Sequence, residues 1–379
     1  MRHPWLFSGA LDTVPEEIAH GSLVHIADSG GKVVATGTYS ARSMIAVRVL
    51  DFSEVAIDRA WLRKTFDAAA EKRARLGLSP DGSISGYRVV FGECDNLPGL
   101  IVDRYNDILV IQISTAGIEN LKSDIVAVLV EMFAPKTILE RSDLPVRKEE
   151  GLADQCGVLF GADVDTVEIR EGSFRFLVDV LNGQKTGFYL DQRELRSAIH
   201  RYAKGCSVLN LFSNSGSFAV AALKGGATHV LNIDSSQPAL DLIDSQLQLN
   251  ELPKENCSFE CRDVFEWISS QTTPAYDMVI VDPPALIKSH RDADSGGKAY
   301  HFLNRAAVRL TNDQGIFVTS SCSSFLPETA FLEILRRASV QANVHLEVLE
   351  RVGQPRDHPV SLYFPESAYL KSFICLVKR

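Results

Sequence analysis

Residues 207–234 read SVLNLFSNSGSFAVAALKGGATHVLNID, and this stretch decides the fold class. A β-type run, Ser207–Phe212, leads through small residues into a helical segment, Gly216–Lys224, and a second β-type run, His229–Asp234, follows. Strand, helix and strand joined by short connections are typical of a parallel sheet. A ligand of such a sheet binds at the carboxyl edge of its strands.

The same alternation continues from about Leu195 onward and predicts a doubly wound α/β domain. A closing antiparallel hairpin is expected at His345–Arg351 and Ser372–Lys378. The other predicted strands are Cys257–Arg262, Tyr276–Val281 and Gly315–Ser320, and the other predicted helices are Gln237–Asn250, Val264–Ser269, Tyr300–Leu310 and Glu328–Val340.

The first half of the chain has a different pattern. Short β-type runs separated by turn signals, followed by a helix near Ile57–Leu76, predict a small β domain. Strands and one long helix, Ile118–Phe133, then predict a compact α+β module. We therefore expect three domains, at residues 1–75, 76–185 and 186–379.

Composition places the chain among soluble globular proteins of two or three domains. It has 379 residues, of which 45% are hydrophobic and 23% charged, and no apolar run reaches the roughly 18 residues of a membrane span. The N-terminus, with Pro4 and Gly9, lacks the apolar stretch of a signal peptide, so a cytoplasmic protein is expected. Seven cysteines without a Cys-x-x-Cys pair favour reduced thiols over disulfides or a metal site.

The net charge of −9 argues against indiscriminate coating of nucleic acid, which depends on Lys and Arg neutralising phosphates. One segment, Arg59–Arg75, is nevertheless rich in basic residues. It is a candidate phosphate-facing stripe, and a solvated helix face is the equally good alternative.

Carboxylates at successive strand ends indicate an adenosine-containing cofactor. Asp234 lies 22 residues after Phe212, the separation typical of a carboxylate that accepts both ribose hydroxyls. Asp263 ends the third strand, where it could bind an adenine amino group or cap the following helix. The Gly-x-Gly-x-x-Gly pattern is absent, which disfavours a dehydrogenase.

Two further residues at the same predicted edge carry chemistry. Asp282-Pro283-Pro284 ends the fourth strand, and the prolines hold the aspartate on a rigid backbone, a pattern that favours methylation of a nucleobase. Cys322 ends the fifth strand. A cysteine there is commonly a small buried hydrophobe, but its convergence with Asp282 and a cofactor predicts a catalytic thiol.

Several strings resemble the bacterial large-subunit ribosomal RNA cytosine-C5 methyltransferases, which join a PUA domain, an EEHEE domain and a Rossmann-like class I methyltransferase domain. The resemblance covers essentially the whole chain. The strings are His3–Gly9, Asn96–Tyr105, Lys185–Arg193, Asp282–Pro284, Ser321–Ser323 and Asp357–Pro359.

This resemblance implies a PUA-like domain, an EEHEE-like domain, S-adenosylmethionine as cofactor and large-subunit ribosomal RNA as partner, with a homodimer as one option for assembly and with no metal. Gln192 and Arg193 would close the site from the preceding segment, although Lys185–Arg193 could instead join two domains structurally. The implied contacts of the cofactor are Asn210, Phe212, Ser213 and Gly216 at its methionine part, Asp234 at its ribose and Asp263 at its adenine, with Asp282 at the same edge.

The chain departs from the family pattern at two places. Asn214-Ser215-Gly216-Ser217 stands where the family usually has Tyr-Thr-Gly-Gly, and Ala285-Leu286 stands where it has Lys-Phe. The first departure lies in the cofactor loop, and the second lies next to the expected base-binding aspartate.

The predicted reaction is formation of 5-methylcytosine through a covalent adduct. Carbon-5 is a poor nucleophile until a thiolate, here Cys322, adds to carbon-6 while Asp282 interacts with ring nitrogen 3. Methylation of an exocyclic amine or of a guanine ring nitrogen is the enzymatic alternative. A non-catalytic RNA-binding assembly factor is the alternative from another class.

Overall fold

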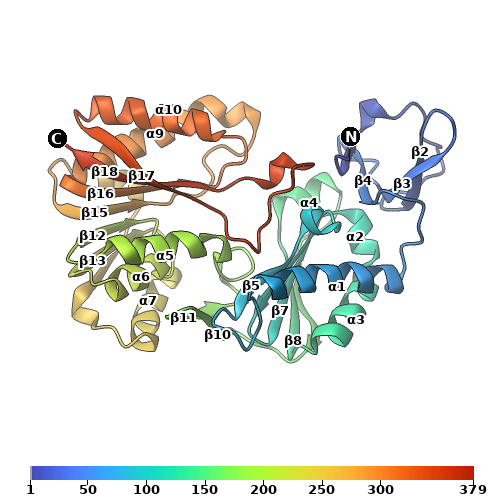
Figure 1. Cartoon of the computed structure of the whole chain (residues 1–379), viewed down its shortest axis with the longest axis horizontal. Helices are drawn as coiled ribbons and strands as arrows, with labels where there is room; N and C mark the ends of the chain where they lie inside the picture. Colours follow the sequence, from blue (N-terminus) through green and yellow to red (C-terminus); the bar gives the residue numbers. More distant parts are fainter. Residues whose placement is uncertain (1) are drawn as a thin grey trace. The chain divides into compact units, whose positions relative to one another are not determined.

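The computed structural model describes residues 2–379 and divides into two compact units (Figure 1). The first unit comprises residues 1–173, 178–190 and 356–367, and the second comprises residues 174–177, 191–355 and 368–379. Residues 356–367, which form most of the loop between the last two strands of the chain, thus belong to the first unit. The division into domains 1–75, 76–185 and 186–379 stays a prediction.

The second unit is built on a seven-stranded sheet of order β14-β13-β12-β15-β16-β18-β17. Its first five strands are parallel, and β18 is antiparallel to both β16 and β17. Such an order reverses direction at β12, so the carboxyl ends of β12 and β15 flank the switch point where α/β proteins bind ligands. The strands are β12 (Ser207–Leu211), β13 (His229–Asp234), β14 (Cys257–Cys261), β15 (Tyr276–Val281), β16 (Thr311–Ser321), β17 (His345–Gly353) and β18 (Lys371–Lys378).

Helices cover both faces of this sheet, as expected for a doubly wound domain (Figure 1). One face carries α8 (Val264–Ser269), α9 (Ala293–Leu310) and α10 (Glu328–Gln341). The other carries α5 (Arg193–Tyr202), α6 (Ser217–Lys224) and α7 (Gln237–Leu249). The central strands β12, β13 and β15 are mostly apolar and buried, which is the pattern of a parallel sheet covered on both faces.

The prediction of a doubly wound fold is confirmed, and the differences are local. Helix α5, which begins at Arg193, was not predicted. Strand β16 begins at Thr311 and helix α9 at Ala293, both earlier than expected. The five predicted parallel strands are present, so their carboxyl ends form the predicted edge of the sheet.

The first unit contains two sheets. A four-stranded sheet has the order β1-β4-β3-β2, and a five-stranded sheet has the order β5-β6-β7-β8-β9 with α1 and α3 packed in its core. Strands β1 and β9 and helix α4 were not predicted. The elements are β1 (Trp5–Phe7), β2 (Leu23–Ala27), β3 (Val33–Tyr39), β4 (Ile45–Asp51), α1 (Arg59–Arg75), β5 (Gly86–Phe91), β6 (Leu100–Tyr105), β7 (Ile108–Ile113), α2 (Ala116–Asn120), α3 (Lys122–Phe133), β8 (Thr137–Ser142), α4 (Pro145–Glu149) and β9 (Gln155–Gly161). A separate hairpin pairs β10 (Thr166–Glu171) with β11 (Phe174–Asp179), and residues 174–177 of β11 are assigned to the second unit.

A buried polar network in the first unit joins three strings that are distant in sequence. Asp103 accepts a bidentate hydrogen bond from Arg88 and a hydrogen bond from Thr186 at 2.7 Å. The Asp357 carboxylate accepts from the backbone N–H of Arg88, and its carbonyl accepts from Arg73. Because buried charges need such partners, Thr186 and Asp357 have a structural role within their strings.

The basic segment α1 is mostly ion-paired. Arg59 contacts Asp124 at 2.6 Å, and Arg73 is buried with both Nη atoms on Asp95. The remaining pairs are Arg63 with Glu131, Lys72 with Asp95 and Arg75 with Glu71. Arg73 therefore cannot face phosphate, and the observations favour the interpretation of α1 as a solvated, paired helix face.

No helix among residues 2–379 is long and apolar enough to cross a lipid bilayer.

Candidate active site

The loop after β12 has an unusual backbone. Phe212, Asn214 and Gly216 adopt positive φ values of 61°, 47° and 77°. Asparagine and glycine tolerate this region, whereas a phenylalanine there is strained. Strain of this kind is concentrated at functional sites, and here it lies at the start of α6. The first N–H groups of a helix have no partner within the helix and can bind an acceptor.

Asp234 holds this loop in place. Its Oδ2 accepts a hydrogen bond from the backbone N–H of Asn214 and its Oδ1 accepts from that of Ser236, both at 2.9 Å. The carboxylate is half-buried at the end of β13, so it retains lone pairs for a ligand. Asp234 thus lies at the end of β13 next to the loop, and its contact with a ribose stays a prediction.

Three buried polar atoms lie at this edge with no hydrogen-bond partner within residues 2–379. They are Gln192 Oε1, Asn210 Oδ1 and Ser213 Oγ. An unsatisfied buried polar atom costs about 1–3 kcal/mol, so a polar ligand that supplies partners is stabilising. Asn210 keeps its amide nitrogen on Asn232 at 2.9 Å. The site thus fits a ligand with ammonium and hydroxyl donors.

Asp263 is the N-cap of α8. Its Oδ1 accepts from the backbone N–H of Glu266 at 2.9 Å, so the capping role is present, and the contact with adenine stays a prediction. Next to it, Phe265 packs edge-on against Phe212, with ring centroids 6.0 Å apart, and stacks on Phe302 at 6.3 Å. This aromatic row was not predicted from the sequence.

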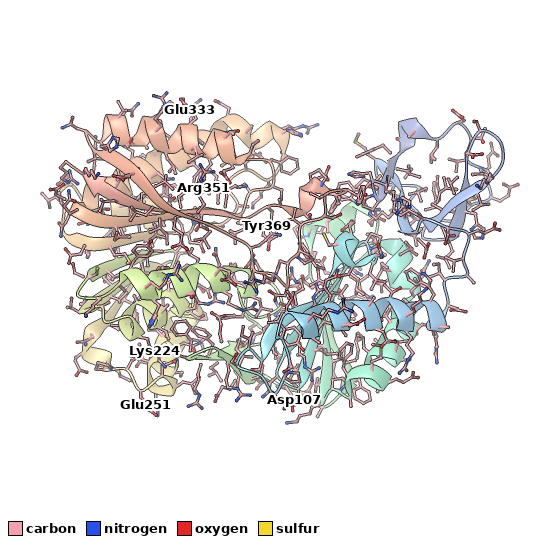
Figure 2. The ribbon with its side chains drawn as sticks, in the orientation of Figure 1. Asp107, Lys224, Glu251, Glu333, Arg351 and Tyr369 are labelled. Carbon is pink, nitrogen blue, oxygen red and sulfur yellow. The ribbon has the colours of Figure 1, made fainter. Side chains whose placement is uncertain are left out.

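Asp282 contacts the segment that precedes α5. Gln192 Nε2 donates a hydrogen bond to Asp282 Oδ2 at 2.8 Å. Tyr369, labelled in Figure 2, donates its hydroxyl to Asp191 at 2.7 Å. The structure therefore brings Gln192 to the aspartate that follows β15. Arg193 is buried at the start of α5, and its role in closing the site stays a prediction.

Cys322 directly follows β16 and is half-buried. Its two neighbours are fixed by Tyr300 of α9, because the Tyr300 hydroxyl lies 2.9 Å from both Ser321 Oγ and Ser323 Oγ. Ser323 Oγ also accepts from the backbone N–H of Ile287 at 3.2 Å. The turn that carries the thiol is thus tied to the segment after Asp282-Pro283-Pro284.

A buried lysine lies beside this turn. Lys371 Nζ donates to the carbonyl oxygen of Ser323 at 2.6 Å. Burial lowers the pKa of Lys371 to about 8, and the charges of Cys322 and Glu328 oppose that shift. Burial also raises the pKa of Tyr300, which keeps its phenol protonated as a donor. Tyr300, Ser321, Ser323 and Lys371 were not predicted as site residues.

Comparison with known proteins agrees with this geometry. Residues 142–361 match the S-adenosylmethionine-dependent methyltransferases, and residues 1–52 match a PUA-like domain. A protein of Pseudoalteromonas translucida named ribosomal RNA large subunit methyltransferase I is 37% identical over 380 residues, which is 99% of this chain and 96% of that protein. The chain belongs to the ribosomal RNA large subunit methyltransferase I family. Like other members of this family, it is an S-adenosylmethionine-dependent methyltransferase with a PUA-like N-terminal domain.

Another member of the methyltransferase I family and a solved structure also match nearly the whole length of this chain. The Vibrio campbellii protein of that name is 39% identical over 381 residues, with 99% of this chain and 96% of the relative covered. The crystal structure of SMU.776 complexed with SAH has a TM-score of 0.85 over 99% of this chain and 96% of that chain. At 22% identity this last likeness establishes the fold.

Proposed function

We propose that this methyltransferase forms 5-methylcytosine in large-subunit ribosomal RNA through a covalent adduct with Cys322. The observation that carries the proposal is the placement of Asp282 and Cys322. Strands β15 and β16 are adjacent and parallel, with Val281 paired to Thr319. Both functional side chains therefore follow neighbouring strands at the edge that also carries the loop after β12.

The Cys322 thiolate would add to carbon-6 of the cytosine, which breaks the aromaticity of the ring and makes carbon-5 nucleophilic. S-adenosylmethionine supplies the electrophilic methyl group that carbon-5 takes up. A base then removes the proton from carbon-5, the sulfur–carbon-6 bond breaks, and the thiolate is regenerated. Half-burial of Cys322 fits this role, because the thiol is reachable and yet held in a fixed turn.

Asp282 would act at ring nitrogen 3, with a hydrogen bond or a proton that takes up the charge moved into the ring. Gln192 fixes the carboxyl group through its 2.8 Å hydrogen bond, and such a partner preserves catalytic geometry. A target base inside a helix must be unstacked or already single-stranded to reach this edge.

The cofactor contacts are supported by the unsatisfied atoms of Gln192, Asn210 and Ser213. These atoms and Gly216 would surround the methionine part of S-adenosylmethionine. Asp234 would accept the ribose hydroxyls, and Asp263 with the neighbouring Phe265 would lie at the adenine. Arg193 would close the site from α5.

Replacing Asp234 with alanine is expected to weaken S-adenosylmethionine binding about 30- to 150-fold, because roughly 2–3 kcal/mol of hydrogen bonding to a charged acceptor is lost. Isothermal titration calorimetry measures the change. Asp241→Ala, an exposed aspartate on α7, is the matched control and should bind as the parent does. Parent-like affinity of the Asp234 variant would remove the ribose assignment.

RNA is the expected substrate because the relatives are named for ribosomal RNA methylation. The α1 face contributes little to this binding on our account, since five carboxylates lie on or against the helix with its six basic residues. Counterion release requires cations that are not already neutralised.

Reversing the charges of Arg59 and Arg63, which pair with Asp124 and Glu131, is therefore expected to leave the salt dependence of RNA binding unchanged. Each lost phosphate contact would reduce the log-log slope by about 0.7–0.9, so the slope of the variant separates the two interpretations. A filter-binding series in potassium chloride measures it. A slope reduced by about one unit with the fold intact would restore α1 as a phosphate-facing stripe.

The tritium released from carbon-5 of labelled cytosine, together with nucleoside mass spectrometry of the product, tests the proposed reaction. Carbon-5 methylation replaces the hydrogen at that carbon, whereas methylation of an exocyclic amine or of a guanine ring nitrogen leaves it in place. An assembly factor without turnover would transfer no methyl group at all. Release of one tritium per methyl group is the expected result.

A further inference from the structure

Lys371 is the first residue of β18, in the interior of the sheet of the second unit. It pairs with Ser321 on β16 and with Gly353 on β17. Directly paired residues of antiparallel strands project to the same face of a sheet, so Lys371 shares a face with Ser321, whose hydroxyl contacts Tyr300. The cysteine that directly follows Ser321 is the proposed nucleophile.

The ammonium group is fixed at this turn. Lys371 is only 9% exposed, and its Nζ lies 2.6 Å from the carbonyl oxygen of Ser323. A carbonyl dipole alone compensates poorly for a buried positive charge. The titratable groups facing the ammonium are Cys322 at the end of β16 and Glu328 on α10, and both favour its charged form.

The coupling between Lys371 and Cys322 acts in both directions. An ammonium beside a thiol favours the thiolate, and cysteines next to lysine have pKa values below the ordinary value of about 8.5. Tyr300 of α9 also faces the thiol, and burial keeps its phenol neutral. Lys371 is thus a buried cation next to the Cys322 turn whose charge favours a thiolate there.

We propose that Lys371 is a positioning residue that holds Cys322 as the thiolate, through the ammonium anchored on the carbonyl of Ser323. Its role in catalysis rests on the proposed function of Cys322. The same ammonium would stabilise the thiolate when it adds to carbon-6 and when it leaves after deprotonation of carbon-5. No proton has to pass from Lys371 to the substrate in either step.

The test is a titration of the Cys322 thiol that does not depend on activity. Iodoacetamide alkylation of the full-length protein is followed against pH, and the peptide containing Cys322 is quantified by mass spectrometry. In the parent protein the alkylation midpoint is expected below about 8.5, and in Lys371→Met it is expected at least one pH unit higher. Lys371→Arg, which keeps the positive charge, should restore most of the difference.

Lys378→Met on the same strand is the matched control, since this lysine is partly exposed and pairs with Glu347, and it should leave the midpoint unchanged. Parent-like cofactor binding by calorimetry confirms that each variant is folded. If Lys371→Met does not fold, the titration of Cys322 in the parent protein still tests the proposal, because an alkylation midpoint at or above about 8.5 overturns it. An unchanged midpoint in a folded Lys371→Met protein overturns it as well.

Methylation measured against pH separates this proposal from the proposed function. The acidic limb of the rate profile is expected to move to higher pH in Lys371→Met by the same amount as the thiol midpoint, while saturating pH recovers most of the rate. If Cys322→Ala still methylates cytosine, the proposed function fails, and the thiol titration remains the measure of the Lys371 proposal.

Discussion

Cys322→Ala is expected to abolish methyl transfer to cytosine while S-adenosylmethionine binding stays near that of the parent. The thiol provides the covalent route. Without it the cytosine ring stays aromatic and carbon-5 remains a poor nucleophile. The loss amounts to several kcal/mol in the barrier and therefore about three or more powers of ten in rate. The proposed cofactor contacts lie on other residues, which is why binding is spared. Transfer of tritium from labelled cofactor measures the rate.

Cys375→Ala is the matched control for this variant. Cys375 is fully buried in β18, and burial raises its pKa to about 12, so it is an inert core thiol. Its replacement leaves a small cavity, which should lower the free energy of unfolding by about 1 kcal/mol and preserve turnover. Near-parent methylation by Cys322→Ala would refute the carbon-5 assignment and favour methylation of an amine or of guanine.

Asp282→Asn is expected to reduce the methylation rate by about 10²- to 10⁴-fold, the usual contribution of a positioned proton donor or acceptor. An amide has nearly the shape of the carboxyl group but cannot take part in proton transfer. The reduction should lie in kcat, because the proposed contact with ring nitrogen 3 strengthens as charge moves into the ring. Steady-state kinetics with a ribosomal RNA fragment measure it.

Asp277→Asn on the same strand is the control for this prediction. Asp277 lies at the opposite end of β15, where the backbone N–H and hydroxyl of Ser207 and the amide of Asn312 hold its pKa below the usual range. Its replacement should affect stability and leave kcat unchanged. Equal kcat values for Asp282→Asn and the parent would show that the aspartate only shapes the strand end.

The sequence was sufficient to predict the edge that carries the candidate site. Parallel strands end at a common edge, so residues that terminate successive strands, such as Asp234, Asp282 and Cys322, must lie along it whatever the details of packing. Element boundaries followed less well. Helix α9 begins earlier than predicted because it includes Gly296 and Gly297, two residues that disfavour helix. The structure shows why Gly296 is needed, since a Cβ there would collide with the carbonyl oxygen of Leu286. Close packing against the segment after Asp282 therefore requires the glycine.

The groups that surround the thiol could not be predicted from local patterns. Lys371 reaches Ser323 across 48 residues because β18 pairs with β16 in a register that only the folded sheet defines. Tyr300 was expected at the start of a helix and is instead inside α9, where its hydroxyl faces β16. Likewise, the pairing of Arg73 with Asp95 depends on packing within the first unit.

Trapping with 5-fluorocytosine tests whether Cys322 forms a covalent adduct with the target base. RNA carrying this base at the target position is incubated with enzyme and S-adenosylmethionine, and the digested protein is sequenced by mass spectrometry. After addition and methylation, fluorine at carbon-5 cannot leave as a proton, so the thioether cannot be expelled. If Cys322 is the nucleophile, we expect a stable adduct on the peptide containing Cys322, with one methyl group on the base. Methylation of unmodified RNA by the same preparation, with no adduct at Cys322, would contradict it.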